Sequence, residues 1–181
     1  MANVVGINFE SIVDGDGVRV VVFFAGCHHH CKGCHNPESH RFDVGRPFNE
    51  EIQAQIIDYI RETPYIDGVT LSGGDPMYSA ADIYAFVKRL REETPYTSVW
   101  LYSGFTFEEI MNDSSMKNLL LLCDVLVDGP FIIEQRDITL SYRGSRNQRI
   151  IDVQKTIASG KVTLWEYNGQ HNHNGFWNTR R

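Results

Sequence analysis

The residues best suited to chemistry are three cysteines that share one short segment. Residues 27–34 read CHHHCKGC, so Cys27, Cys31 and Cys34 follow a C-x3-C-x2-C spacing. Iron–sulfur clusters are normally held by four cysteine thiolates. Because no fourth cysteine lies nearby, one iron would stay open to a ligand other than protein, and an open position is what distinguishes catalytic metal sites from structural ones. The segment therefore predicts a catalytic metal centre.

A structural zinc site is the competing interpretation of this segment. Zinc is commonly bound by three cysteines and one histidine. Four neighbouring histidines could supply that fourth ligand: His28, His29, His30 and His35. The cysteines alone leave both interpretations open. The remaining cysteine, Cys123, follows the apolar run 119–122, and we expect it to be a small buried hydrophobic residue.

A second candidate site is the segment Gly73-Gly74-Asp75, within residues 71–76 that read LSGGDP. Two glycines after a strand can simply supply the positive φ angles of a turn. They can also let a ligand approach bare backbone, while Asp75 accepts hydrogen bonds from a ligand ammonium group. The position at the end of a predicted strand favours the ligand-binding interpretation.

Polar and charged residues elsewhere have two interpretations each. The turn at residues 14–19 is either an ordinary solvated turn or part of a rim that borders the metal centre and receives a partner's peptide. Arg143, Asn147 and Arg149 are candidates for binding a ligand carboxylate or the partner. Asp128, which follows the apolar run 125–127, is either a solvated strand end or a residue that faces a ligand.

Longer motifs resemble those of one enzyme family. Residues 15–27 read GDGVRVVVFFAGC and match G-x-G-x-R-x-x-x-F-x-x-G-C, the signature of the glycyl-radical activating enzymes within the radical S-adenosylmethionine (SAM) family. The segment LSGGDP resembles that family's Gly-Gly-Glu motif, in the Gly-Gly-Asp-Pro form of activators of anaerobic (class III) ribonucleotide reductase. Later blocks resemble the same activators: 99–104, 124–131 and 143–148. The resemblance covers residues 10–152.

The resemblance implies a set of cofactors and the residues that bind them. A [4Fe–4S] cluster would be held by Cys27, Cys31 and Cys34, and its fourth iron would chelate SAM. Further contacts to SAM are carried over from the matched positions: Gly33, Cys34, His35, Gly73, Gly74, Asp75 and Asp128. Asp75 stands where most of the superfamily has glutamate, so its reach is shorter by one methylene. No general acid or base is required, because the cofactors carry the chemistry.

The resemblance also implies a partner. Reductive cleavage of SAM at the cluster would generate a glycyl radical on anaerobic ribonucleoside-triphosphate reductase, with an electron donor such as flavodoxin or ferredoxin. An activator of pyruvate formate-lyase or of another glycyl-radical enzyme is the alternative among enzymes. A zinc-stabilised binding module is the alternative of another class.

Alternating strands and helices are predicted to position these motifs. Strands are expected at 18–24, 68–71, 98–102 and 124–127. Helices are expected after the N-cap residues Asn49, Ser79 and Thr106, the last two in capping boxes, and from 115 to 122. Parallel strands joined by helices bind ligands beyond their carboxyl ends, where the cysteine and glycine motifs lie.

The chain length limits the fold. A complete eight-fold barrel needs about 250 residues, and this chain has 181. We therefore expect an α/β fold with an incomplete, open (βα) barrel and a mainly parallel sheet, and the resemblance implies the partial barrel of radical SAM enzymes. Residues 1–167 should form the activase domain, with 162–166 as a further strand, and 168–181 a polar, flexible tail.

Composition excludes several other classes. The residues are 42% hydrophobic and 22% charged, and no apolar run approaches the roughly 20 residues of a membrane span. The first residues, 1–4, show no export signal, so we expect a cytoplasmic protein with reduced thiols. A net charge of −6 argues against a nucleic-acid backbone as the main partner.

Overall fold

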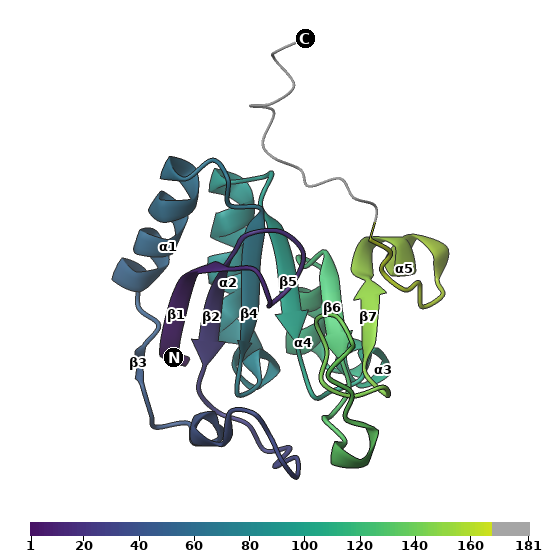
Figure 1. Cartoon of the computed structure of the whole chain (residues 1–181). Helices are drawn as coiled ribbons and strands as arrows, with labels where there is room; N and C mark the ends of the chain where they lie inside the picture. Colours follow the sequence, from purple (N-terminus) through teal and green to yellow (C-terminus); the bar gives the residue numbers. More distant parts are fainter. Residues whose placement is uncertain (168–181) are drawn as a thin grey trace.

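A single seven-stranded sheet forms the frame of the molecule (Figure 1). In this computed structural model, which describes residues 1–167, the strands lie in the order β3-β1-β2-β4-β5-β6-β7. The strands are β1 (Asn3–Ser11), β2 (Arg19–Phe24), β3 (Arg46–Pro47), β4 (Gly68–Gly73), β5 (Ser98–Tyr102), β6 (Val125–Asp128) and β7 (Arg149–Asp152).

The centre of the sheet is parallel and its edges are antiparallel. Strands β2, β4, β5 and β6 pair in parallel, whereas β1, β3 and β7 pair antiparallel with their neighbours. The expected α/β fold with an open, mainly parallel sheet is therefore confirmed. Four of the five strands predicted from sequence are the four parallel ones, each within two residues of its predicted bounds.

Helices connect the parallel strands, and one more helix follows β7. The connecting helices are α1 (Glu50–Glu62), α2 (Ala80–Glu93), α3 (Phe107–Asn112) and α4 (Ser114–Leu120), and α5 (Val153–Ser159) follows β7. Asn49 caps α1 by accepting a hydrogen bond from the Ile52 amide, and Thr106 forms the predicted capping box with Glu109. The capping box predicted at Ser79 is wrong, because α2 continues directly from the 3-10 turn η2 (Pro76–Ser79) and the Ser79 side chain makes no capping bond.

The main hydrophobic core lies between the helices and one face of the sheet. Alternate residues of β2, namely Val20, Val22 and Phe24, point into it. They pack with buried residues of α1, α2 and α4, such as Ile56 and Phe86. Because side chains alternate across a strand, the intervening residues of the parallel strands point to the opposite face.

The opposite face holds a buried arginine among aromatic rings. Arg19, at the start of β2, is 1% exposed, and its guanidinium lies 5.3 Å from the centre of the Trp100 ring. Trp100 in turn packs edge-on against Tyr142 and Trp165. The sequence predicts that the 14–19 turn is either solvated or part of a rim that receives a partner, and neither expectation holds for Arg19. Its side chain is buried and contacts the turn from the protein interior.

Hydrogen bonds show what Arg19 holds together. Its guanidinium donates to the carbonyl of Asp16 and the hydroxyl of Thr70. It also donates to the Val69 carbonyl and to both the hydroxyl and the carbonyl of Ser98. The turn before β2 is thereby joined to the first residues of β4 and β5. Burial lowers the pKa of Arg19 to about 10, which leaves it charged at neutral pH.

The end of the described chain differs from expectation. The strand predicted at 162–166 is reduced to one bridge between Leu164 and Ile151, next to a hydrogen bond from the Trp165 amide to the Ile150 carbonyl. The predicted tail, 168–181, lies outside the described residues. Among residues 1–167, no helix has both the length and the apolarity needed to cross a membrane.

Candidate functional site

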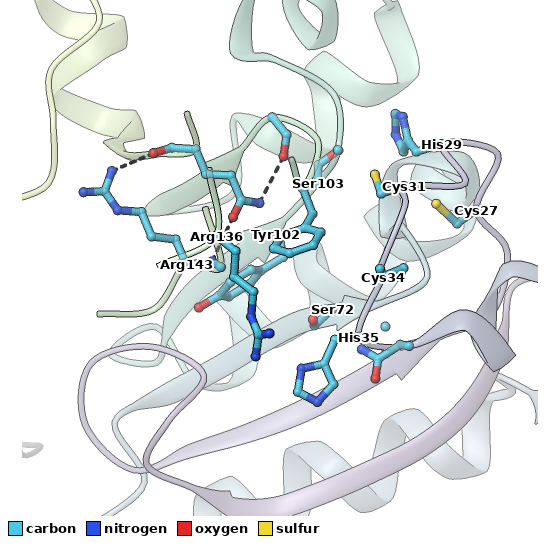
Figure 2. Close-up of a pocket in the computed structure, with 18 of the residues that line it drawn as sticks. Cys27, His29, Cys31, Cys34, His35, Ser72, Tyr102, Ser103, Arg136 and Arg143 are labelled. Carbon is cyan, nitrogen blue, oxygen red and sulfur yellow. Dashed lines mark hydrogen bonds between the residues drawn. The ribbon is translucent and has the colours of Figure 1, made fainter. Parts of the chain in front are cut away.

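A cavity of about 750 Å³ lies at the carboxyl ends of the parallel strands. This volume is in the range of small-molecule sites. The cavity is lined by most of the site residues predicted from sequence: Cys27, Cys31, Gly33, Cys34, His35, Gly73 and Gly74. Figure 2 shows the cysteines along one side, with Tyr102, Arg136 and Arg143 on the other. The structure therefore brings the two strongest motifs to one site, while Asp75 and Asp128 are not among the lining residues.

The cysteine loop leaves β2 directly and is fixed by backbone hydrogen bonds. The amides of Gly26 and Cys27 donate to the carbonyls of Ser39 and His40, at 2.7 and 3.0 Å. Cys27 is buried, Cys31 and Cys34 are partly exposed, and all three are free thiols. Burial raises the pKa of the Cys27 thiol, while the backbone amides of His29 and His30 oppose that rise.

These thiols fit an iron–sulfur cluster better than a single metal ion. Amides directed at a sulfur stabilise its thiolate form, which is the form that binds metals. Tetrahedral zinc with bonds of about 2.3 Å needs its sulfurs within roughly 4 Å of one another. Within residues 1–167, no three ligand side chains converge closely enough for one ion. A cluster is held at separate iron corners by separate cysteines, so three cysteines spread along one cavity wall suit it.

The glycine pair is required by close backbone packing. Gly73 has φ +108°, and a side chain there would meet the Phe24 backbone at 2.4 Å. Gly74 has an ordinary φ, but a Cβ would lie 2.6 Å from the Gly26 carbonyl oxygen. The glycines therefore do more than form a turn. They press the end of β4 against the start of the cysteine loop and leave bare backbone facing the cavity.

Asp75 is buried beneath the cavity floor. It is 1% exposed, and its Oδ1 accepts a hydrogen bond from the Met77 amide. Its Oδ2 lies 2.9 Å from each of three groups: the Ser103 hydroxyl, the Gly104 amide and His29 Nε2. Both carboxylate oxygens are therefore occupied by protein partners. Because Ser103 and Gly104 line the cavity, Asp75 acts on the site by holding its wall.

His29 connects the cysteine loop to this wall. His29 stands between Cys27 and Cys31 in the sequence. Its imidazole contacts the carboxylate of Asp75. A side chain at position 104 would come within 2.5 Å of the His29 ring, so Gly104 is needed for this contact. From sequence alone, His29 is either a possible zinc ligand or, beside a cluster, an outer hydrogen-bond donor or a solvated side chain. The sole sequence signal for its partners was that Ser103 and Gly104 follow a predicted strand.

Asp128 is also held by protein groups. Its carboxylate accepts a hydrogen bond from the Phe107 amide, at the start of α3, and pairs with Arg149. Arg149 pairs in addition with Glu108, and these pairs raise the pKa of its guanidinium. Asp128 and Arg149 thus join β6, β7 and α3. Its neighbour Gly129 lines the cavity instead.

The loop at residues 130–148 covers the remaining side of the cavity. Gln148 holds it by accepting hydrogen bonds from the amides of Gly144 and Ser145 and donating to the Gly129 carbonyl. Asn147 donates to the Pro130 carbonyl, which leaves Arg143 as the cavity-lining member of the three polar candidates predicted here. The loop also contributes lining residues that sequence reasoning missed: Phe131, Ile133, Arg136 and Tyr142.

The environment of Cys123 differs from that of the three loop cysteines. It is fully buried, its sulfur contacts the Leu119 carbonyl at 3.4 Å, and burial raises the pKa of its thiol. It does not line the cavity. The expectation of a small buried hydrophobic residue is confirmed.

Comparisons with known proteins agree with this geometry. Residues 13–151 match the family model described as a 4Fe-4S single cluster domain. A protein of Pasteurella multocida (strain Pm70), named anaerobic ribonucleoside-triphosphate reductase-activating protein, is 40% identical over 142 residues, which are 77% of this chain and 90% of that protein. A protein of the same name from Escherichia coli (strain K12) is 37% identical, and the match covers 76% of this chain and 90% of that protein. Another from Enterobacteria phage T4 is 32% identical, and the match covers 76% of this chain and 86% of that protein.

Proposed function

The chain belongs to the family of anaerobic ribonucleoside-triphosphate reductase-activating proteins, and we propose that it activates such a reductase by generating its glycyl radical at a SAM-bound [4Fe–4S] cluster. The observation that carries the proposal is the meeting of three free cysteines and the Gly73-Gly74 backbone in one cavity. When bound, the reduced cluster and SAM would supply the one-electron chemistry that removes a hydrogen atom from a glycine Cα. The electron donor is proposed to be a flavodoxin or a ferredoxin.

The chain's own residues would bind and orient these groups. Cys27, Cys31 and Cys34 would hold three irons and leave the fourth facing the cavity. Gly33, His35 and the Gly73-Gly74 backbone line that cavity, within which SAM would be bound. Asp75 is a positioning residue, because its carboxylate is already used by internal partners. Asp128 is proposed to act in the same indirect way, through Gly129.

The fold supports the finer proposal of a radical SAM partial barrel. Four parallel strands are covered by helices on one face, whereas loops 12–18 and 130–148 fold over the other. Both loops contribute residues to the cavity wall, so the inner face is enclosed without a complete ring of strands. Antiparallel β1 and β7 flank the four parallel strands on their two sides.

The cavity mouth suits a peptide partner. Val13 and Ile138 line it although they are 72% and 84% exposed. Contiguous exposed apolar surface marks protein contact sites, and we propose that these two residues belong to such a surface. The part of the 14–19 turn nearest to this rim is Asp14, which also lines the cavity. A reductase segment that contains the target glycine would contact this rim and exclude water from the reaction.

Replacing Asp75 tests its positioning role. In Asp75→Ala the buried amide of Met77 and the partly buried amide of Gly104 lose their acceptor, and a buried group without a partner costs about 1–3 kcal/mol. We expect the affinity for SAM to fall roughly tenfold, about 1.4 kcal/mol, with iron content unchanged. SAM binding is measured by isothermal titration calorimetry on the reconstituted protein. The control is Asp58→Ala, at an exposed residue. An unchanged SAM affinity in Asp75→Ala would show that Asp75 does not position the SAM site.

Anaerobic reconstitution tests the proposed function as a whole. We expect a brown protein that, once reduced and given SAM, forms 5′-deoxyadenosine and methionine. Chromatography of the products measures the cleavage, and an unreduced sample is the control. A colourless protein that binds one zinc and leaves SAM intact would instead support the zinc-stabilised module.

A further inference from the structure

One ring nitrogen beside the cysteine loop has no partner. His40 ends the 3-10 turn η1 (Pro37–His40) and lines the same cavity as Cys27, Cys31 and Cys34. Its Nε2 is shielded from solvent, and within residues 1–167 no group lies at hydrogen-bond distance from it. Buried polar atoms are nearly always hydrogen-bonded, so this nitrogen points to a missing acceptor or ligand.

The position of His40 is fixed by its backbone. Its carbonyl accepts the hydrogen bond of the Cys27 amide at 3.0 Å, and the preceding residue, Ser39, binds the Gly26 amide. The ring of His40 packs edge-on against that of His30, with 5.1 Å between their centres. His30 lies within the loop, between the first two cysteines. The His40 side chain is therefore held against the loop that would carry the cluster.

A sulfur atom of the cluster is the acceptor that best suits this nitrogen. Sulfides and thiolates of iron–sulfur clusters accept hydrogen bonds, and such bonds help to set the reduction potential. Reduction adds one negative charge to the cluster, so an N–H donor stabilises the reduced form and raises the potential. Resting on the proposed function, we infer that His40 Nε2–H donates a hydrogen bond to a sulfur of the cluster and makes it easier to reduce.

Direct ligation by His40 is the other chemistry open to the nitrogen. Three cysteines and one histidine make a closed set of four ligands. Such a set would leave no open iron for SAM, which conflicts with the proposed function. The two roles also differ in their consequences, because removing a donor changes the potential whereas removing a ligand changes the metal content.

The test compares His40→Phe with His40→Gln in the reconstituted protein. Phenylalanine keeps a ring against His30 but removes the donor, while glutamine places an N–H group at a similar distance from the backbone. The reduction potential is measured by a redox titration without SAM, in which the electron paramagnetic resonance (EPR) signal of the reduced cluster is monitored. We expect a more negative potential in His40→Phe, a return toward wild type in His40→Gln, and equal iron content in all three proteins.

A second measurement detects the hydrogen bond itself. Electron–nuclear double resonance of the wild-type reduced cluster in deuterated water should show an exchangeable deuteron coupled to the cluster, and this coupling should weaken in His40→Phe. An unchanged potential in His40→Phe would overturn the inference, as would loss of iron from that variant or a coupling typical of a nitrogen bound to iron. If SAM is still cleaved in those cases, only the role of His40 fails. A wild-type chain that assembles no cluster would instead overturn the proposed function.

Discussion

Alanine at Cys27, Cys31 or Cys34 should abolish the iron–sulfur cluster, whereas alanine at Cys123 should leave it intact. The three loop cysteines line one cavity, and each would hold a different iron corner. Removing one leaves two protein ligands, too few to retain a four-iron cluster. Cys123 is fully buried away from the cavity, so its replacement removes only a small core side chain.

Iron and sulfide analysis of the anaerobically reconstituted variants measures this effect, together with visible absorption. We expect less than about a tenth of wild-type iron in each loop variant and no detectable SAM cleavage, since an open iron is needed to bind SAM. Circular dichroism should show folded protein in all four variants. Near wild-type iron and SAM cleavage in Cys31→Ala would refute the ligand assignment, and so would loss of the cluster in Cys123→Ala.

Replacing Arg19 should cause the largest loss of stability. Its guanidinium makes five hydrogen bonds in a fully buried position, and three of them go to backbone carbonyls. In Arg19→Met those carbonyls and two hydroxyls lose their donor, with little gain from the apolar side chain. Each buried acceptor left without its donor typically costs about 1–3 kcal/mol, so the total is a large part of the roughly 5–15 kcal/mol by which domains are stable.

Urea denaturation followed by tryptophan fluorescence measures the loss, and Trp100 lies beside the substituted residue. The matched control is Arg89→Met, which removes a surface pair with Glu93 on α2. Such a pair is worth less than about 1 kcal/mol. Equal free energies of unfolding for Arg19→Met and Arg89→Met would show that the buried network contributes nothing to the fold.

The parallel centre of the fold could be predicted because its strands are buried on both faces. Such strands read as continuous apolar runs, as residues 20–24 and 125–127 do. The antiparallel strands show no such signal. β1 is half-exposed and contains Gly6 and Asn8, and β7 has only four residues. Both pair antiparallel with the outermost parallel strands, where partly polar sequences are tolerated.

The parts of the candidate site that depend on residue spacing within one segment could be predicted from the sequence. The cysteines and the glycine pair are of this kind, since each motif follows a buried strand. The direction of a buried carboxylate is not encoded locally: Asp75 turns to Gly104 and Asp128 to Arg149, both distant in sequence. For the same reason, the contact of His29 with Asp75 and the unpartnered Nε2 of His40 follow from the folded structure and not from the local sequence.

The function proposed for this chain is to install a glycyl radical on an anaerobic ribonucleoside-triphosphate reductase. EPR spectroscopy tests it most directly, on the reduced protein mixed with SAM and the reductase from the same source. A glycine Cα can lose its hydrogen because the resulting radical is stabilised by the amide groups on both sides. We therefore expect a persistent glycyl doublet that is absent without SAM and absent with Cys31→Ala. A reductase that stays silent, while pyruvate formate-lyase acquires the doublet under the same conditions, would contradict the claim.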